Sequence, residues 1–214
     1  MPSYITVQKG GNGRYEEKKS VFLGEIRHVV SEEEALAFVR DIKKKHYDAR
    51  HHCYAYRIGR TQPDLHASDD GEPSGTAGRP ILDVLAGADV TDAVLVVTRY
   101  FGGTLLGTGG LVRAYTSAAR DCLKQSVLVE RRQGIRILLT AAYPDVGRIR
   151  HMTEERGIQV ISSTYTERVQ MECVLPEEDG DAFIRKITDL TSGRTETEKT
   201  GLVWYDSRVF SAEN

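Results

Sequence analysis

The pattern of hydrophobic and polar positions predicts a strand over residues 21–30, followed directly by a helix. Ser31 and the three glutamates after it form a helix start, because an N-cap hydroxyl and acidic side chains complement free backbone N–H groups. Apolar residues then recur at helical spacing, and three lysines stand where the helix should end. The helix is therefore expected to begin after Ser31 and to end near Lys45.

The remainder of the first half continues to alternate between strands and helices. The run over 93–98 is continuously apolar and β-branched, which suits a strand buried on both faces. The segment before residue 21 contains three glycines and gives no clear pattern. The expected elements are a strand over 53–58, a polar loop over 60–80, a helix over 81–88, the strand over 93–98, a helix over 111–125 and a short strand over 127–130.

The second half predicts the order β-α-β-β-α-β, which is the ferredoxin-like arrangement. Gly157 stands where a helix commonly ends in a glycine, and Pro176 precedes an acidic first helical turn. The expected elements are a strand over 135–141, a helix over 145–156, strands over 158–165 and 168–175, a helix over 177–190 and a strand over 197–205.

Length and charge favour two domains. The chain has 214 residues, which allows one large domain or two small ones. The formal net charge of −2 is divided unequally: residues 1–132 hold 19 basic and 17 acidic residues, whereas residues 133–214 hold 10 and 14. We place the boundary near the charged step at 130–134, which gives domains of 1–132 and 133–214. Contact with nucleic acid is therefore expected on the slightly basic first domain, and contact with a protein partner on the acidic second one.

Several classes of protein are not expected. No apolar run approaches the roughly 20 residues that span a bilayer, and the N-terminus has no secretory pattern, so we expect a cytoplasmic protein without a membrane contact. Cys53, Cys122 and Cys173 are odd in number and far apart, which indicates thiols in a reducing compartment. His51 and His52 are adjacent in a strand and point to opposite faces, so no metal site is expected. No cofactor is expected either.

The first segment that could carry chemistry is a polar loop over 68–80. It holds three carboxylates, three hydroxyls, three glycines and one arginine, and no apolar residue larger than alanine or proline. Such a loop either lies on the surface and begins the following helix, or presents polar groups to a ligand or partner.

The second is a glycine-rich segment that runs from a buried strand into a helix over 99–113. A strand, a glycine loop and a helix N-terminus together present backbone N–H groups to an anion, and Tyr100 and Phe101 offer faces for stacking. Neither nucleotide fingerprint fits, because Thr108 stands where a P-loop needs lysine and Val112 where a dinucleotide fold needs glycine. A general phosphate or nucleic-acid backbone site remains, and so does a purely structural role in tight packing.

Three motifs in order resemble the bacterial YigZ/YvyE-type branch of the IMPACT family. They are His51-His52-Cys53-Tyr54-Ala55, the loop over 68–80, and Arg99-Tyr100-Phe101-Gly102-Gly103 with Leu106-Gly107-Thr108-Gly109-Gly110-Leu111. The resemblance extends over the whole chain. It implies an N-terminal domain with the fold of ribosomal protein S5 domain 2 and a C-terminal ferredoxin-like domain similar to elongation-factor G domain V.

The resemblance also implies a link to translation. Eukaryotic relatives regulate translation through a protein partner, the activator of an initiation-factor kinase, which they contact with an additional N-terminal domain. This sequence shows no such domain, so that contact is not carried over. The bacterial members have no settled activity, and the S5-like fold serves both RNA binders and sugar kinases.

We expect the family-motif residues to converge at one end of the N-terminal sheet and to form a binding site. The candidate residues are His52, Asp69, Asp70, Gly71, Glu72, Gly75, Thr76, Arg79, Arg99, Tyr100, Phe101, Gly102, Gly103, Gly107, Gly109, Gly110 and Arg113.

Three functions remain open for this site. The first is a translation-associated regulatory protein that binds RNA, the ribosome or a translation factor. The second is a protein-binding scaffold, which a flat apolar patch on the C-terminal sheet would favour. The third is an enzyme for a small phosphorylated or acyl substrate, with Asp69, Asp70 or Glu72 as acid/base groups.

Overall fold

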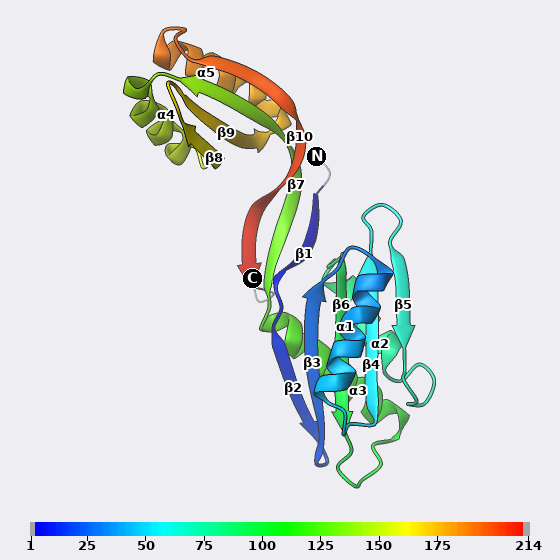
Figure 1. The fold of residues 1–214 in the computed structure, drawn as a ribbon. Coiled ribbons are helices and arrows are strands. Elements are labelled where there is room, and N and C mark those ends of the chain that lie inside the picture. Colours follow the sequence, from blue (N-terminus) through cyan, green and yellow to red (C-terminus); the bar gives the residue numbers. More distant parts are fainter. Residues whose placement is uncertain (1–2, 212–214) are drawn as a thin grey trace. The chain divides into compact units, whose positions relative to one another are not determined.

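The computed structural model describes residues 3–211, which form two compact units (Figure 1). Among the described residues, the N-terminal unit comprises 4–130 and 207–211, and the C-terminal unit comprises Ser3 and 131–206. The predicted α+β class with two domains is confirmed.

The first ten elements are β1 (Ser3–Lys9), β2 (Asn12–Glu17), β3 (Ser20–His28), α1 (Glu32–Lys45), β4 (His51–Ile58), β5 (Asp64–Ser68), α2 (Gly78–Gly87), β6 (Ala93–Tyr100), α3 (Gly107–Lys124) and β7 (Val127–Ala141). They are followed by α4 (Tyr143–Glu155), β8 (Gln159–Tyr165), β9 (Val169–Pro176), a 3-10 turn (Glu177–Asp179), α5 (Gly180–Thr191) and β10 (Glu196–Ser211).

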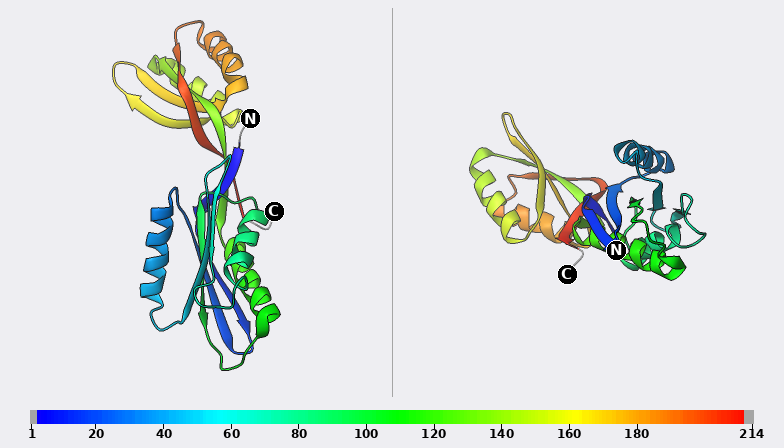
Figure 2. Two further views of the ribbon diagram at one scale, coloured as in Figure 1. Left: turned by 90° about the vertical axis from the view of Figure 1, so that its right-hand side faces the viewer. Right: turned by 90° about the horizontal axis from the view of Figure 1, so that it is seen from below.

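An antiparallel sheet with the strand order β2-β3-β6-β4-β5 forms the middle layer of the N-terminal unit. Helix α1 covers one face, and α2 and α3 cover the other (Figure 2). The central strand β6 is buried from Ala93 to Arg99, which confirms the strand predicted to be buried on both faces. Its Leu95 and Val97 pack with α2 and α3, whereas Val94 and Val96 pack with α1.

Helix α1 begins as the sequence predicts. The Ser31 hydroxyl accepts a hydrogen bond from the N–H of Glu34 at 3.2 Å, and the Glu34 carboxylate accepts one from the N–H of Val30 at 2.9 Å. Its apolar face, which includes Phe38 and Ile42, is buried against the sheet. The three lysines at its end place positive charge at the negative end of the helix dipole.

The C-terminal unit has the predicted order β-α-β-β-α-β. Strand β8 pairs with β9, β9 pairs with β7, and β7 pairs with β10. One face of this sheet forms a core with α4 and α5 through residues such as Ile137 and Met171. The opposite face carries Arg136 and Glu172, 3.9 Å apart, together with Thr140, so charged and polar side chains interrupt the apolar patch that would favour a protein scaffold.

Two local expectations are wrong, and one segment for which no element was predicted forms strands. The glycine-bearing start of the chain forms strands, because β2 packs closely on α3: a Cβ on Gly13 would lie 2.4 Å from the backbone nitrogen of Cys122. Part of the expected polar loop is the edge strand β5, whose residues are exposed or half-buried and so show no apolar alternation. The two strands expected over 127–130 and 135–141 are one strand of 15 residues, β7, and the two compact units divide within it, between Glu130 and Arg131.

Candidate functional site

The loop over 68–80, here called the acidic loop, is folded around the carboxylate of Asp69. Its two oxygens accept hydrogen bonds from the N–H groups of Gly75, Ala77 and Gly78 at 2.8–2.9 Å. Gly78 is the first residue of α2, and the N-cap residue Ala77 has no side chain that could satisfy those donors. Burial disfavours the charged form of Asp69, but the three N–H donors outweigh it and the pKa of this carboxyl is lowered. Asp69 therefore serves as the cap that Ala77 lacks.

The neighbouring Asp70 ties the acidic loop to α1 and β4. Its carboxylate lies 2.8 Å from the ammonium of Lys43 and accepts a hydrogen bond from the N–H of His52 at 2.7 Å. Burial disfavours the charged carboxylate, but these partners lower its pKa. The residue adopts a left-handed φ of 41°, and Gly71 follows with a φ of 87°, so the chain turns sharply here.

Glu72 and Arg99 form an ion pair inside the N-terminal unit, with 2.7 Å between Oε1 and Nη1 and both side chains almost fully buried. The Tyr115 hydroxyl donates to the same Glu72 oxygen at 2.8 Å. The other guanidinium nitrogen of Arg99 lies 3.5 Å from the hydroxyl of Ser20, which also accepts a hydrogen bond from the N–H of Gly102 at 3.1 Å. This network joins the acidic loop, β3, the end of β6 and α3.

Aromatic rings enclose the same guanidinium. The Arg99 side chain lies 5.5 Å from the ring centroids of both Phe22 and Phe101. Such distances suit a cation–π contact, which adds to the ion pair in a dry environment. Arg99 is therefore a structural residue, and its charge is not presented to a ligand.

These pairings bear on acid–base and nucleophilic chemistry. The pKa values of Asp69 and Asp70 are lowered, and Glu72 is held in its ion pair. Burial raises the pKa of the Cys53 thiol and of the Tyr115 phenol, so neither is ionised at neutral pH. Burial likewise raises the pKa of Cys122 and of Cys173 to about 12. The lowered pKa values of the two aspartates do not suit a general acid, and the raised pKa values of the three thiols do not suit a nucleophile at neutral pH.

The remaining polar candidates also have partners. His52 is buried, and its Nε2 lies 3.0 Å from the carbonyl oxygen of His46. The Tyr100 hydroxyl lies 3.0 Å from both His46 Nδ1 and Asp48, on the α1 face of the sheet. Thr76 donates to the carbonyl of Pro73, and Arg79 pairs with Asp83 at 2.7 Å. The structure thus brings the candidates of the first two motifs together. Their polar groups chiefly make hydrogen bonds and ion pairs within the N-terminal unit.

The segment over 101–110, here called the glycine segment, is different. Gly102 is required for close packing, because a Cβ there would lie 2.1 Å from the backbone carbon of Lys19. Gly103 and Gly107 have φ values of 85° and 73°, which favour glycine, but their missing side chains would meet nothing. Gly109 is exposed and Gly110 is buried under Leu106.

Two apolar side chains of the glycine segment are exposed. Phe101 is 50% exposed and Leu105 is 83% exposed. Arg113, in the second turn of α3, is exposed too, and no side chain caps the start of that helix. This end of the unit presents an aromatic ring, a cation and free helical N–H groups, which suits an anionic partner.

Three residues of the site escaped the sequence prediction. Ser20 and Tyr115 complete the buried network, and Leu105 is the most exposed apolar residue of the glycine segment. Ser20 lies 31 residues before the first motif and Tyr115 four residues after the last, and neither has a distinguishing pattern. Leu105 had a weak signal, since two adjacent leucines between Thr104 and Gly107 have no helical or strand partner positions.

Neither a metal centre nor a spanning helix is found in the part of the chain that the structure describes. Residues 3–211 contain no group of three histidine, cysteine or acidic side chains arranged to hold an ion. His51 lies 3.0 Å from the carbonyl of Asp70, whereas His52 contacts His46. No helix within the same residues has the length and apolar character needed to cross a membrane.

Comparison with known proteins decides the family. Residues 18–123 match the Impact N-terminal domain, and residues 139–194 match a domain of unknown function (DUF1949). YvyE of Bacillus subtilis (strain 168), an IMPACT family member, is 39% identical over 98% of this chain and 96% of its own. The chain belongs to the IMPACT family. The resemblance seen in the motifs is therefore confirmed, and both domain matches lie within residues that the structure describes.

Other IMPACT proteins match a smaller share of the chain. An IMPACT homologue of Dictyostelium discoideum is 37% identical over 42% of this chain and 27% of its own. Among solved structures, a crystal structure described only as that of a hypothetical protein is 35% identical, with a TM-score of 0.61 over 92% of this chain and 97% of that one. The two-domain architecture is thus shared, whereas no activity comes with it.

Proposed function

We propose that this IMPACT protein is a cytoplasmic, translation-associated regulatory protein that binds RNA, including the RNA of the ribosome, through the glycine segment. The observation that carries the proposal is the exposed combination of Phe101, Arg113 and the uncapped start of α3. An exposed ring can stack on a base, and the cation and helix N-terminus can hold a phosphate. The link to translation rests on membership of the family and on the role that the resemblance implies for its eukaryotic relatives.

The same contacts argue against the enzymatic alternative. Asp69, Asp70 and Glu72 would have to act as acid or base, yet each is occupied by N–H donors or cations. A general acid at neutral pH needs a raised pKa, and those of Asp69 and Asp70 are lowered. A regulatory binding protein needs none of these groups to be free.

The test is co-sedimentation with ribosomes over a series of salt concentrations. We expect the bound fraction to fall steeply with salt, because phosphate contacts release counterions. Phe101→Ala and Arg113→Ala should each weaken binding, and Arg113→Ala should also lower the salt dependence. Arg99 is not a suitable probe, since its loss would disturb the buried ion pair.

Arg40 provides a matched control, because it is an exposed arginine on α1, across the sheet from α3. Arg40→Ala should leave sedimentation unchanged. Sedimentation that both glycine-segment variants leave intact would overturn the proposal.

We also propose the two fold names that the resemblance implies. The pairing order β10-β7-β9-β8 with α4 and α5 on one face supports a ferredoxin-like C-terminal domain. The sheet of the N-terminal unit, with α1 on one face and α2 and α3 on the other, supports the S5 domain 2-like name.

A further inference from the structure

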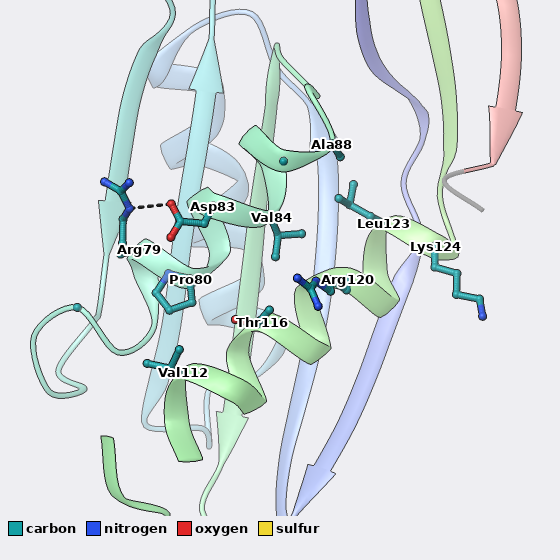
Figure 3. Close-up of a pocket in the computed structure, with 12 residues that line it drawn as sticks. Arg79, Pro80, Asp83, Val84, Ala88, Val112, Thr116, Arg120, Leu123 and Lys124 are labelled. Carbon is teal, nitrogen blue, oxygen red and sulfur yellow. Dashed lines mark hydrogen bonds and ion pairs between the residues drawn. The ribbon is translucent and has the colours of Figure 1, made fainter. Parts of the chain in front are cut away.

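A groove of about 790 Å³ lies between α2 and α3 on the outer face of the N-terminal unit (Figure 3). It is separate from the exposed tip of the glycine segment, since neither Phe101 nor Leu105 lines it. Each wall is a row of side chains four residues apart, the spacing that places side chains on one face of a helix. Pro80, Val84 and Ala88 form the α2 wall, and Val112, Thr116 and Arg120 form the α3 wall.

The floor of the groove is aliphatic and its borders are basic. Val84, Val112 and Leu123 contribute apolar surface. In Figure 3 the Arg120 side chain extends from α3 toward α2. Arg79 and Lys124 also line the groove, whereas its only acidic lining residue is Asp83, which is already paired with Arg79 at 2.7 Å. Since Asp83 neutralises Arg79, Arg120 is the lining cation whose charge bears on the choice of a partner.

We propose that this groove, which we call the α2–α3 groove, binds an amphipathic helical segment of a partner protein that carries acidic residues beside its apolar anchors. The row from Pro80 to Ala88 rises by about 12 Å, which matches roughly two turns of a partner helix. Two turns present apolar side chains at positions i, i+3 or i+4, and i+7, the usual anchors of a helix held in a groove. An acidic side chain on its flank complements Arg120, which extends from α3 toward α2.

An RNA strand is a poorer occupant of the α2–α3 groove. No aromatic side chain lines it, so an unstacked base would find no ring to stack on. A phosphodiester backbone would use the cations but would leave the aliphatic floor unfilled. The groove thus supplements the proposed RNA contact with a second surface of different chemistry.

The experiment measures fluorescence polarisation of a labelled synthetic peptide titrated with the full chain. The probe is a helix-forming peptide with leucines at i, i+3 and i+7 and glutamates on either side. A second peptide has lysines in place of the glutamates. We expect the acidic peptide to bind and the basic peptide not to bind, and added salt should weaken the interaction. Arg120→Glu should reduce affinity for the acidic peptide about tenfold or more.

Charge reversal also gives a control for folding, since Arg120→Glu should gain affinity for the basic peptide. Arg40→Glu, an exposed change on α1, should alter neither affinity, and Phe101→Ala should also have no effect. Arg120→Glu is expected to change peptide binding, whereas Phe101→Ala is expected to change RNA binding. The two variants therefore distinguish this proposal from RNA binding by the glycine segment.

The proposal is overturned if the unaltered chain does not bind the acidic peptide, or if Arg120→Glu changes neither affinity. A further result would also overturn it. In that result a labelled single-stranded RNA binds the chain, Arg120→Glu abolishes this binding, and the acidic peptide does not displace the RNA. That last result would assign the groove to nucleic acid.

Discussion

The acidic loop and the glycine segment of the N-terminal unit both follow a strand and lead into a helix. In the acidic loop, Asp69 caps α2, Asp70 pairs with Lys43, and Glu72 is buried against Arg99. In the glycine segment, Phe101 and Leu105 are exposed and no side chain caps α3. Residues that resemble catalytic groups thus bind one another inside the unit, whereas the segment without carboxylates keeps its apolar side chains exposed. The difference shows that polar residue types alone do not identify a binding surface.

Removing one member of the buried pair should give the largest effect. Glu72→Ala leaves the Arg99 guanidinium buried without its anion, so we expect the free energy of unfolding to fall by about 3–5 kcal/mol. Urea denaturation followed by circular dichroism measures this change. Glu72→Leu combined with Arg99→Met should recover much of the loss, because apolar residues of similar volume need no partner. A loss near zero for Glu72→Ala would mean that the acidic loop is not part of the framework.

The two adjacent glycines after Phe101 offer the next comparison. Gly102→Ala places a Cβ against the backbone of Lys19 and should cost about 3 kcal/mol of unfolding free energy. Gly103→Ala meets no neighbouring atom and should cost only about 1 kcal/mol, for its left-handed backbone. Thermal or urea unfolding of both variants measures the difference. Equal losses would contradict the division of the glycine segment into a packed start and an open remainder.

The cap formed by Asp69 should have a smaller, pH-dependent effect. Asp69→Ala should lower the free energy of unfolding by about 1–2 kcal/mol at neutral pH, because three N–H groups lose their acceptor. The folded-state pKa of Asp69 is lowered, so this stabilisation is present above the unfolded-state pKa of about 3.9 and is lost as the pH falls through the folded-state value. Urea unfolding of both proteins at neutral and acidic pH should show the difference shrinking in acid. A difference that grows in acid would contradict this role.

Leu105 should show the smallest effect on stability. Its side chain is 83% exposed, so Leu105→Ser should change the free energy of unfolding by no more than about 0.5 kcal/mol. The same urea series provides the measurement. A loss as large as that of Asp69→Ala would show that Leu105 packs against the domain and is not available to a partner.

Much of the framework could be predicted from local patterns. The Ser31 cap, the apolar face of α1 and the buried strand β6 each carry a signal within a few residues. Strand β5 could not be predicted, because an exposed edge strand has no apolar alternation. Helices α2 and α3 also begin earlier than predicted, at Gly78 and Gly107, because glycine has a low helix propensity and does not indicate a helix start.

The convergence of the motifs could be predicted from the sequence, whereas the internal pairing of their side chains could not. The motifs do meet at one end of the sheet, but the pairing of Glu72 with Arg99 joins residues 27 positions apart, which no local pattern reveals. The α3 wall of the groove was visible in principle, because Val112, Thr116 and Arg120 are spaced by four. Its significance depends on α2 lying opposite, which only the tertiary structure provides.

The central claim is that the acidic loop is closed by internal hydrogen bonds while the glycine segment is open, and amide hydrogen exchange tests it most directly. Among the described residues, the N–H groups of Gly75, Ala77 and Gly78 are bound by Asp69, whereas the hydrogen bonds found include none from Gly103, Thr104 or Leu105. We predict slow exchange at the first three amides, fast exchange at 103–105, and loss of protection at 75, 77 and 78 in Asp69→Ala. Equally fast exchange in both segments, or protection that survives Asp69→Ala, would contradict the account.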